Sequence, residues 1–334
     1  MSTNYRHPWL AGVALAGMLL SAVHAAEPKL PRDGWVSWQI PAVDRAPAWC
    51  CCANGGRADS AAVPCRLDDR HDGWNIRNRD ATTAAVKVYV RTQGGTIERL
   101  QVLSADCPVE TATPVETLND VSLDDSVHWL ASQVRSSAED AVTHRPLGES
   151  ALAALALHRG DLARDSLAGF ARDPDMEIRK WSVFWLAMLR GAEGAEITSS
   201  VMFNDADPRV REHAAFALSQ SHAPRVTTDL ARLGNTDKSG EVRAKAWFWL
   251  AHTGAAESEA AIGAALHHDA DAGVREQAIF ALSRLPGERA PRALIAAAED
   301  RTLPHEIRKR AVFWLSQSNS DAAQAYLDKV LATR

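Results

Sequence analysis

Residues 205–218 read DADPRVREHAAFAL, and the pattern of this stretch returns through the second half of the chain. Each of five copies holds Ile or Val followed by Arg, then Phe five positions after the Arg and Leu two positions after the Phe. The Arg column is Arg179, Arg211, Arg243, Arg275 and Arg308, at spacings of 32, 32, 32 and 33, and the Phe column is Phe184, Phe216, Phe248, Phe280 and Phe313. Such a fixed period is typical of repeat proteins whose units pack on their neighbours.

Each unit reads as two helices. A residue suited to cap a helix N-terminus precedes the apolar run in four units. These residues are Asp175, Asp207, Ser239 and Asp271, and the last unit has Pro304 in the same column. The second helices lie between the Arg-Phe helices, for example at 256–267 and 290–299, and 321–334 supplies a closing helix. Residues 149–159 form a degenerate earlier copy.

The stretch from Asp205 to Ala215 resembles the D-x-D-P-x-V-R-x-x-A-A core of HEAT repeats, in the short subtype named after the phycobilisome lyases. The resemblance covers about residues 145–334. It implies a mainly α fold, an α-solenoid of five to six two-helix repeats of about 32 residues. It also implies an extended surface that binds another protein.

The Phe column has two interpretations. At about 100° per residue, the Ile or Val, the small residue three positions after the Arg and the Leu lie on one apolar side of the helix. The Phe lies almost opposite. We expect neighbouring repeats to bury the Phe side chains between them, so that Phe248→Ala costs about 3–5 kcal/mol. The alternative is an exposed groove for a ligand.

The residues after the Phe column alternate between large and small: Trp185, Ala217, Trp249, Ala281 and Trp314. This alternation favours interlocking packing between neighbouring units. If the solenoid has a hot spot for a partner, we expect it at these tryptophans, together with Trp181 and Trp247.

An Asp column accompanies the Arg column and predicts a ladder of charge-assisted hydrogen bonds between repeats. Its members are Asp173, Asp205, Asp237 and Asp269. A surface charge pattern unrelated to stacking is the alternative.

The first third of the chain has the sequence pattern of strands and turns instead of helices. Residues 86–91 alternate with period two and place three valines on one face, Gln93-Gly94-Gly95 signals a turn, and 97–103 is the returning strand. Residues 35–40 are a shorter candidate strand. We therefore expect a small β-rich domain at 26–115, a helical linker or cap at 116–148 and the solenoid at 149–334.

The N-terminus has the three parts of a secretory signal peptide: a short polar start with Arg6, an apolar run at 9–23 and small residues before Ala25. We expect cleavage near Ala25. The mature chain is then exported and soluble, in the periplasm or secreted, with no membrane insertion.

Export favours structural disulfides among the cysteines. These are Cys50, Cys51, Cys52, Cys65 and Cys107. The simplest scheme joins two members of the 50–52 triplet to Cys65 and Cys107 and leaves one thiol over. A soft-metal or redox site with His71 is the alternative, although no paired C-x-x-C spacing supports it.

The net charge and the absence of catalytic motifs argue against several classes of function. Lys plus Arg is 37 and Asp plus Glu is 42, a net charge of −5 without a basic cluster, which argues against nucleic-acid binding. No G-x-S-x-G, Walker loop or H-E-x-x-H motif occurs. We expect a protein-binding scaffold without catalysis, cofactor or metal. The alternatives are a metal- or thiol-dependent enzyme centred on the cysteines, or a HEAT-type di-iron hydroxylase using Glu212-His213 and His305-Glu306.

Overall fold

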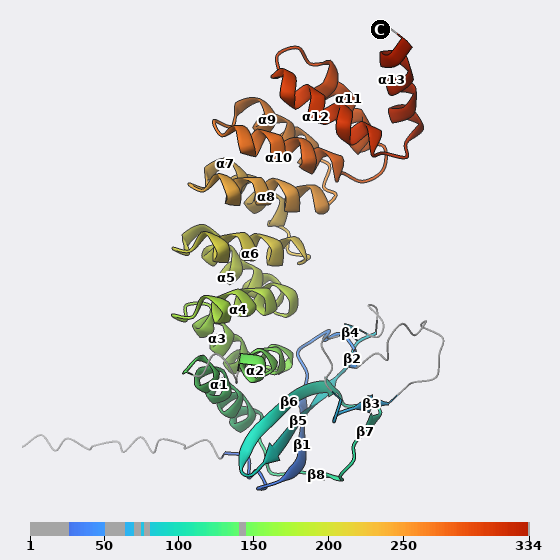
Figure 1. Ribbon diagram of the computed structural model, residues 1–334. Coiled ribbons are helices and arrows are strands. Elements are labelled where there is room, and N and C mark those ends of the chain that lie inside the picture. Colours follow the sequence, from blue (N-terminus) through green and yellow to red (C-terminus); the bar gives the residue numbers. More distant parts are fainter. Residues whose placement is uncertain (1–26, 51–63, 70–74, 77–80, 140–144, 333–334) are drawn as a thin grey trace, which may run out of the picture.

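The computed structural model describes residues 27–50, 64–69, 75–76, 81–139 and 145–332. A strand-rich region comes first and a stack of helix pairs follows (Figure 1). The predicted fold class, a solenoid preceded by a small β region with a disulfide, is therefore confirmed. Residues 1–25, for which a signal peptide is predicted, lie outside the described residues.

The main sheet contains four strands in the order β6-β5-β1-β8. They are β1 (Gly34–Pro41), β5 (Ala85–Gln93), β6 (Thr96–Ser104) and β8 (Val115–Thr117). The predicted hairpin is confirmed, because β5 pairs antiparallel with β6 across Gly94 and Gly95, whose φ angles of 61° and 87° suit glycine. The valines of β5 are fully buried, as their alternation predicted.

Four two-residue strands make two smaller pairs. β2 (Trp49–Cys50) lies antiparallel to β4 (Asn75–Ile76), and β3 (Cys65–Arg66) lies parallel to β7 (Val109–Glu110). Cys50 and Cys107 form a disulfide with Cα atoms 5.7 Å apart, inside the usual range. Cys65 is buried. Because Cys51 and Cys52 lie outside the described residues, the second bridge of the predicted scheme stays a prediction.

The helices stack as two layers (Figure 1). One layer is α4, α6, α8, α10 and α12, whose members contact each other in succession, and the second helix of each repeat lies behind it. The bounds are α1 (Leu123–Glu139), α2 (Arg145–Leu157), α3 (Asp161–Phe170), α4 (Met176–Leu189), α5 (Gly191–Asn204), α6 (Pro208–Ser219), α7 (Val226–Thr236), α8 (Gly240–His252), α9 (Ser258–His268), α10 (Ala272–Ser283), α11 (Arg289–Glu299), α12 (His305–Ser316) and α13 (Asp321–Ala332).

The predicted caps are confirmed. Asp175, Asp207, Ser239 and Asp271 each accept a hydrogen bond from a backbone N–H in the first turn of the following helix. Pro304 stands in the same position before α12 without a side-chain cap. Each cap satisfies a backbone donor that the helix itself leaves unpaired.

The sheet and the first helices share one core. Trp38 of β1 packs edge-on against Trp129 of α1, with ring centroids 5.3 Å apart. The indole Nε1 of Trp38 donates to Ser126 Oγ (2.8 Å), which lies 2.7 Å from Nε2 of the fully buried His158. Burial lowers the pKa of His158 to about 4, so this imidazole is neutral at pH 7. The polar chain therefore holds the sheet to the base of the solenoid.

Among the described residues, no helix combines the length and the apolar character that crossing a membrane requires.

Candidate functional site

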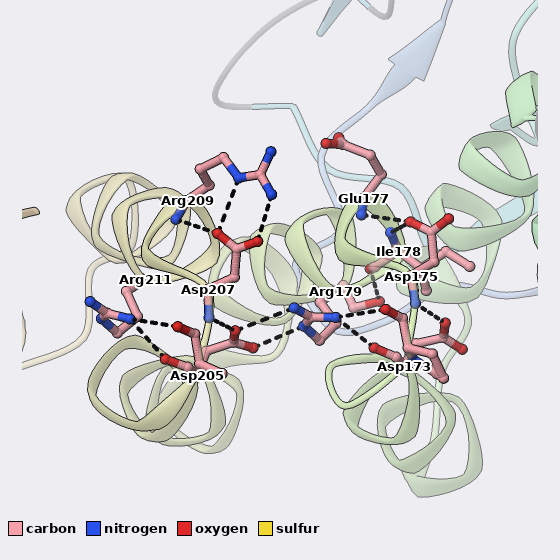
Figure 2. Close-up of polar contacts among 12 residues, drawn as sticks. Asp173, Asp175, Glu177, Ile178, Arg179, Asp205, Asp207, Arg209 and Arg211 are labelled. Carbon is pink, nitrogen blue, oxygen red and sulfur yellow. Dashed lines mark hydrogen bonds and ion pairs between the residues drawn. The ribbon is translucent and has the colours of Figure 1, made fainter.

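The predicted Arg–Asp ladder exists between three pairs of successive repeats. Nε of Arg179 lies 2.9 Å from Asp205, that of Arg211 lies 2.7 Å from Asp237 and that of Arg243 lies 2.8 Å from Asp269. Each of these arginines also donates to the backbone carbonyl of the Asp six residues before it, as Figure 2 shows for Arg179 and Arg211. One guanidinium therefore joins the turn of its own repeat to the turn of the next.

The ladder stops before the C-terminal repeat. Arg275 donates to the carbonyl of Asp269 (2.5 Å) and Arg308 to that of Leu303 (3.3 Å), and neither has an ion pair among the described residues. The guanidinium of Arg243 holds the pKa of the Asp269 carboxyl below its usual value, against the opposing effect of burial. The paired Arg and Asp side chains are largely buried, and each already has its hydrogen-bond partner within the chain. The ladder therefore has a structural role.

The Phe column joins neighbouring repeats, as predicted, but it is not buried. Phe184 stacks on Phe216 with ring centroids 6.0 Å apart, and Phe248 stacks on Phe280 at 5.6 Å. The first four rings are half-buried, and Phe313 is 47% exposed. The expectation that neighbouring repeats bury these rings is met only in part, because the stacked rings cover each other's faces while the rest of each ring stays exposed.

Trp249 and Trp314 extend this row. The Trp249 ring lies 4.8 Å from Phe216, and that of Trp314 lies 5.0 Å from Phe280. Both indoles are half-buried, so each tryptophan fits between its own phenylalanine and that of the preceding repeat. We call the continuous row the aromatic stripe, and its members are Phe184, Phe216, Trp249, Phe248, Phe280, Trp314 and Phe313.

Two of the predicted hot-spot tryptophans are not accessible. Trp185 is 5% exposed and packs against Trp49 of β2, at 5.7 Å between ring centroids. Trp247 is fully buried beneath Gly234, where even a Cβ would collide with the indole ring. Both belong to the core, so the proposal that they contact a partner is withdrawn. Trp181 is half-buried beside Phe184, next to the stripe.

His213, which the sequence suggested only as part of an iron site, lies in this aromatic surface instead. His213 lies among Phe184, Phe216 and Trp181, with ring centroids 5.6 to 6.4 Å away. Burial, helped by the charge of Lys180, lowers the pKa of His213 to about 4. The neutral ring adds to the apolar character of the stripe.

Two hollows open beside the C-terminal part of the stripe. The first, of about 520 Å³, lies between α8 and α10, and the second, of about 310 Å³, lies between α10 and α12. Phe280 and Gln277 line both. Two glycines, Gly240 and Gly273, line the first hollow. The other repeats have larger residues at these two positions, and this difference is the sequence signal that could have located the hollow.

The enzyme alternatives gain no support from the side chains in view. The described part of the chain has no group of three or more His, Cys, Asp or Glu side chains placed to hold a metal ion. His305 is exposed and lies 3.3 Å from Glu306, whereas His213 is enclosed by aromatic rings. Cys51, Cys52 and His71 lie outside the described residues.

These features define an α-solenoid with an aromatic face. A comparison with protein families matches residues 164–247 and 233–316 to HEAT repeats, so the helix pairs of this part of the chain are HEAT repeats. The match is to HEAT repeats in general, and the short subtype rests on the resemblance of the motif. No curated protein matches the chain.

Solved structures with a similar arrangement of helices come from varied proteins. Human deoxyhypusine hydroxylase in complex with glycerol is 17% identical over 62% of this chain and 90% of its own, with a TM-score of 0.29. YibA from Escherichia coli is 18% identical over 61% and 77%, with a TM-score of 0.38. The CpcE–CpcF complex of phycocyanin lyase from Nostoc sp. PCC7120 is 16% identical over 66% and 98%, with a TM-score of 0.29. Likenesses this distant carry no conclusion about activity.

Proposed function

We propose that this chain is an exported protein-binding scaffold and that its aromatic stripe is the surface that contacts a protein partner. The observation that carries the proposal is the continuity of the stripe from α4 to α12, with Phe313 47% exposed at its end. Aromatic side chains provide large contact area at low entropic cost and are enriched at protein interfaces. Export rests on the signal-peptide pattern, with which the Cys50–Cys107 disulfide is consistent.

The stripe is suited to binding because its geometry is already fixed before a partner arrives. Every ring in it contacts a ring of its own or a neighbouring helix, and the Arg–Asp ladder joins the repeats beneath it from Arg179 to Asp269. A pre-organised surface loses little side-chain freedom on association. Catalysis forms no part of the proposal.

The test is capture of a partner from the cell envelope with three forms of the full mature chain. These are the wild type, Phe280→Ala/Phe313→Ala on the stripe, and Leu331→Ala as the control. Leu331 is 69% exposed on α13 and is not a member of the stripe, so its removal tests whether losing any exposed apolar side chain weakens binding. Thermal melts of all three confirm that they are folded.

We expect a protein that binds the wild type and the control equally and binds the stripe variant at least tenfold more weakly when measured with purified components. Equal binding to all three forms, or the absence of any bound protein, would contradict the proposal.

A further inference from the structure

The larger hollow has an equivalent position elsewhere in the solenoid that holds larger and charged side chains. The repeats of α4 and α6 are equivalent to those of α8 and α10, because the ladder arginines Arg179 and Arg211 precede Arg243 and Arg275 by 64 residues (179 + 64 = 243; 211 + 64 = 275). Comparing residues 64 positions apart therefore shows what the chain itself places in this space.

In the α4–α6 pair, two carboxylates are neutralised by two cations of the chain. Glu177 lies 3.1 Å from Lys180, and Asp207 lies 2.7 Å from Arg209, as Figure 2 shows for the aspartate. The Asp207 carboxyl has its pKa lowered to about 2, chiefly by the hydrogen bond from the Arg209 side chain. Met176 occupies the start of α4.

In the α8–α10 pair, both carboxylates remain but the large and charged neighbours are gone. Glu241 and Asp271 correspond to Glu177 and Asp207. The positions of Lys180, Arg209 and Met176 are taken by Ala244, Gly273 and Gly240. The result is the hollow of about 520 Å³, which all five of these residues line.

Both carboxylates that line this hollow are exposed to solvent. Within the described chain neither Glu241 nor Asp271 forms an ion pair, and Asp271 accepts from the backbone N–H of Gly273 (2.8 Å). The Asp271 carboxylate lies against Gly240, where a Cβ would collide with it, so it is held at the junction of the two helices. Lys245 also lines the hollow but pairs with Glu212 of α6 at 3.3 Å.

Apart from the amide of Gln277, the remaining walls are apolar. Phe248 and Phe280 of the stripe form one side and Val274 another. A long side chain with an aliphatic stem and a cationic end matches this combination, since the stem covers the rings and the charge meets the carboxylates.

We propose that this hollow binds a lysine or arginine side chain from an extended segment of the protein partner, in the place that Lys180 and Arg209 occupy in the α4–α6 pair. The inference rests on the proposed function and specifies the partner chemistry. The hollow adjoins the stripe through Phe248 and Phe280, so the basic residue anchors a segment whose apolar residues lie along the rings.

The test uses a random library of displayed 12-residue peptides, selected on the full mature chain and then synthesised for affinity measurement. Glu241→Gln/Asp271→Ser removes both charges and keeps a capping oxygen, since Ser239 caps α8 in the same column. Glu177→Gln/Asp207→Ser makes the identical change in the α4–α6 pair, whose carboxylates already have cations, and is the matched control.

We expect the selected peptides to be enriched in Lys and Arg, to bind the Glu241→Gln/Asp271→Ser variant about fivefold to tenfold more weakly and to bind the control as they bind the wild type. Replacing the basic residue of the peptide by Gln produces the same loss. Peptides that need the stripe but carry no basic residue, or that bind the hollow variant as tightly as the wild type, would overturn this inference and leave the scaffold proposal standing. If no selected peptide loses affinity for Phe280→Ala/Phe313→Ala, both proposals fail.

Discussion

At the scale of single residues, the ion pair between Arg211 and Asp237 is nearly removed from water. Its side chains are 3% and 4% exposed, and the guanidinium also donates to the backbone carbonyl of Asp205. Replacing Arg211 by Met leaves the Asp237 carboxylate buried without a counter-charge. We expect a loss of roughly 3–5 kcal/mol in the free energy of unfolding, measured by denaturant titration.

The neighbouring arginine of the same helix is the control. Arg209 also pairs with an aspartate, Asp207, but its side chain is 68% exposed and solvent screens the pair. Arg209→Met should leave the unfolding midpoint almost unchanged. Removing both members of the inner pair, as in Arg211→Met/Asp237→Asn, should cost less than the two single changes together. Equal effects of the Arg209 and Arg211 substitutions would show that burial of the ladder has no energetic consequence.

At the scale of one helix, α8 presents two adjacent aromatic residues to different surroundings. Trp247 is fully buried against α7, and Phe248 is half-buried on the stripe between Phe280 and Trp249. We expect Trp247→Ala to cost about 3–5 kcal/mol, and Phe248→Ala only about 1–3 kcal/mol. Denaturant titration of both variants measures the difference. A loss for Phe248→Ala as large as that for Trp247→Ala would contradict the half-buried position.

This helix also marks the limit of what could be predicted from the sequence. The spacing places Phe248 on the side of α8 opposite its buried Val and Leu residues, and the structure agrees. The angle between two residues on one helix follows directly from 3.6 residues per turn. Whether Phe248 is covered depends on how closely α8 approaches α6 and α10, and that distance is set by side chains on three helices. The same limit applies to the hollow: Gly240 and Gly273 are visible in the sequence, but their facing positions require the stacking of α8 on α10.

At the scale of the whole molecule, the sheet and the solenoid depend on each other. Trp49 of β2 packs on Trp185 of α4, Trp38 packs on Trp129, and α2 contacts β6. No local pattern relates these residues, so the sequence predicted the strands and the repeats but not the joint between them. The guanidinium of Arg190, at the end of α4, ties α4 to α2 by donating to the carbonyls of Leu155 and His158.

Cutting the chain at the boundary that the sequence suggests should therefore damage the solenoid. A chain of residues 116–334 keeps every repeat but exposes Trp129, Trp185 and the sheet-facing side of α2, which are buried in the complete chain. We expect it to melt at a lower temperature than the mature chain and to bind a dye specific for exposed apolar surface, because it loses apolar burial without losing any repeat. A shorter chain that begins at Asp161 lacks α1 and α2 in addition to the sheet. Its melting temperature shows how much α1 and α2 themselves contribute to stability. If residues 116–334 melt at the same temperature as the mature chain and bind no dye, the shared core contributes nothing to stability and the two parts are independent domains.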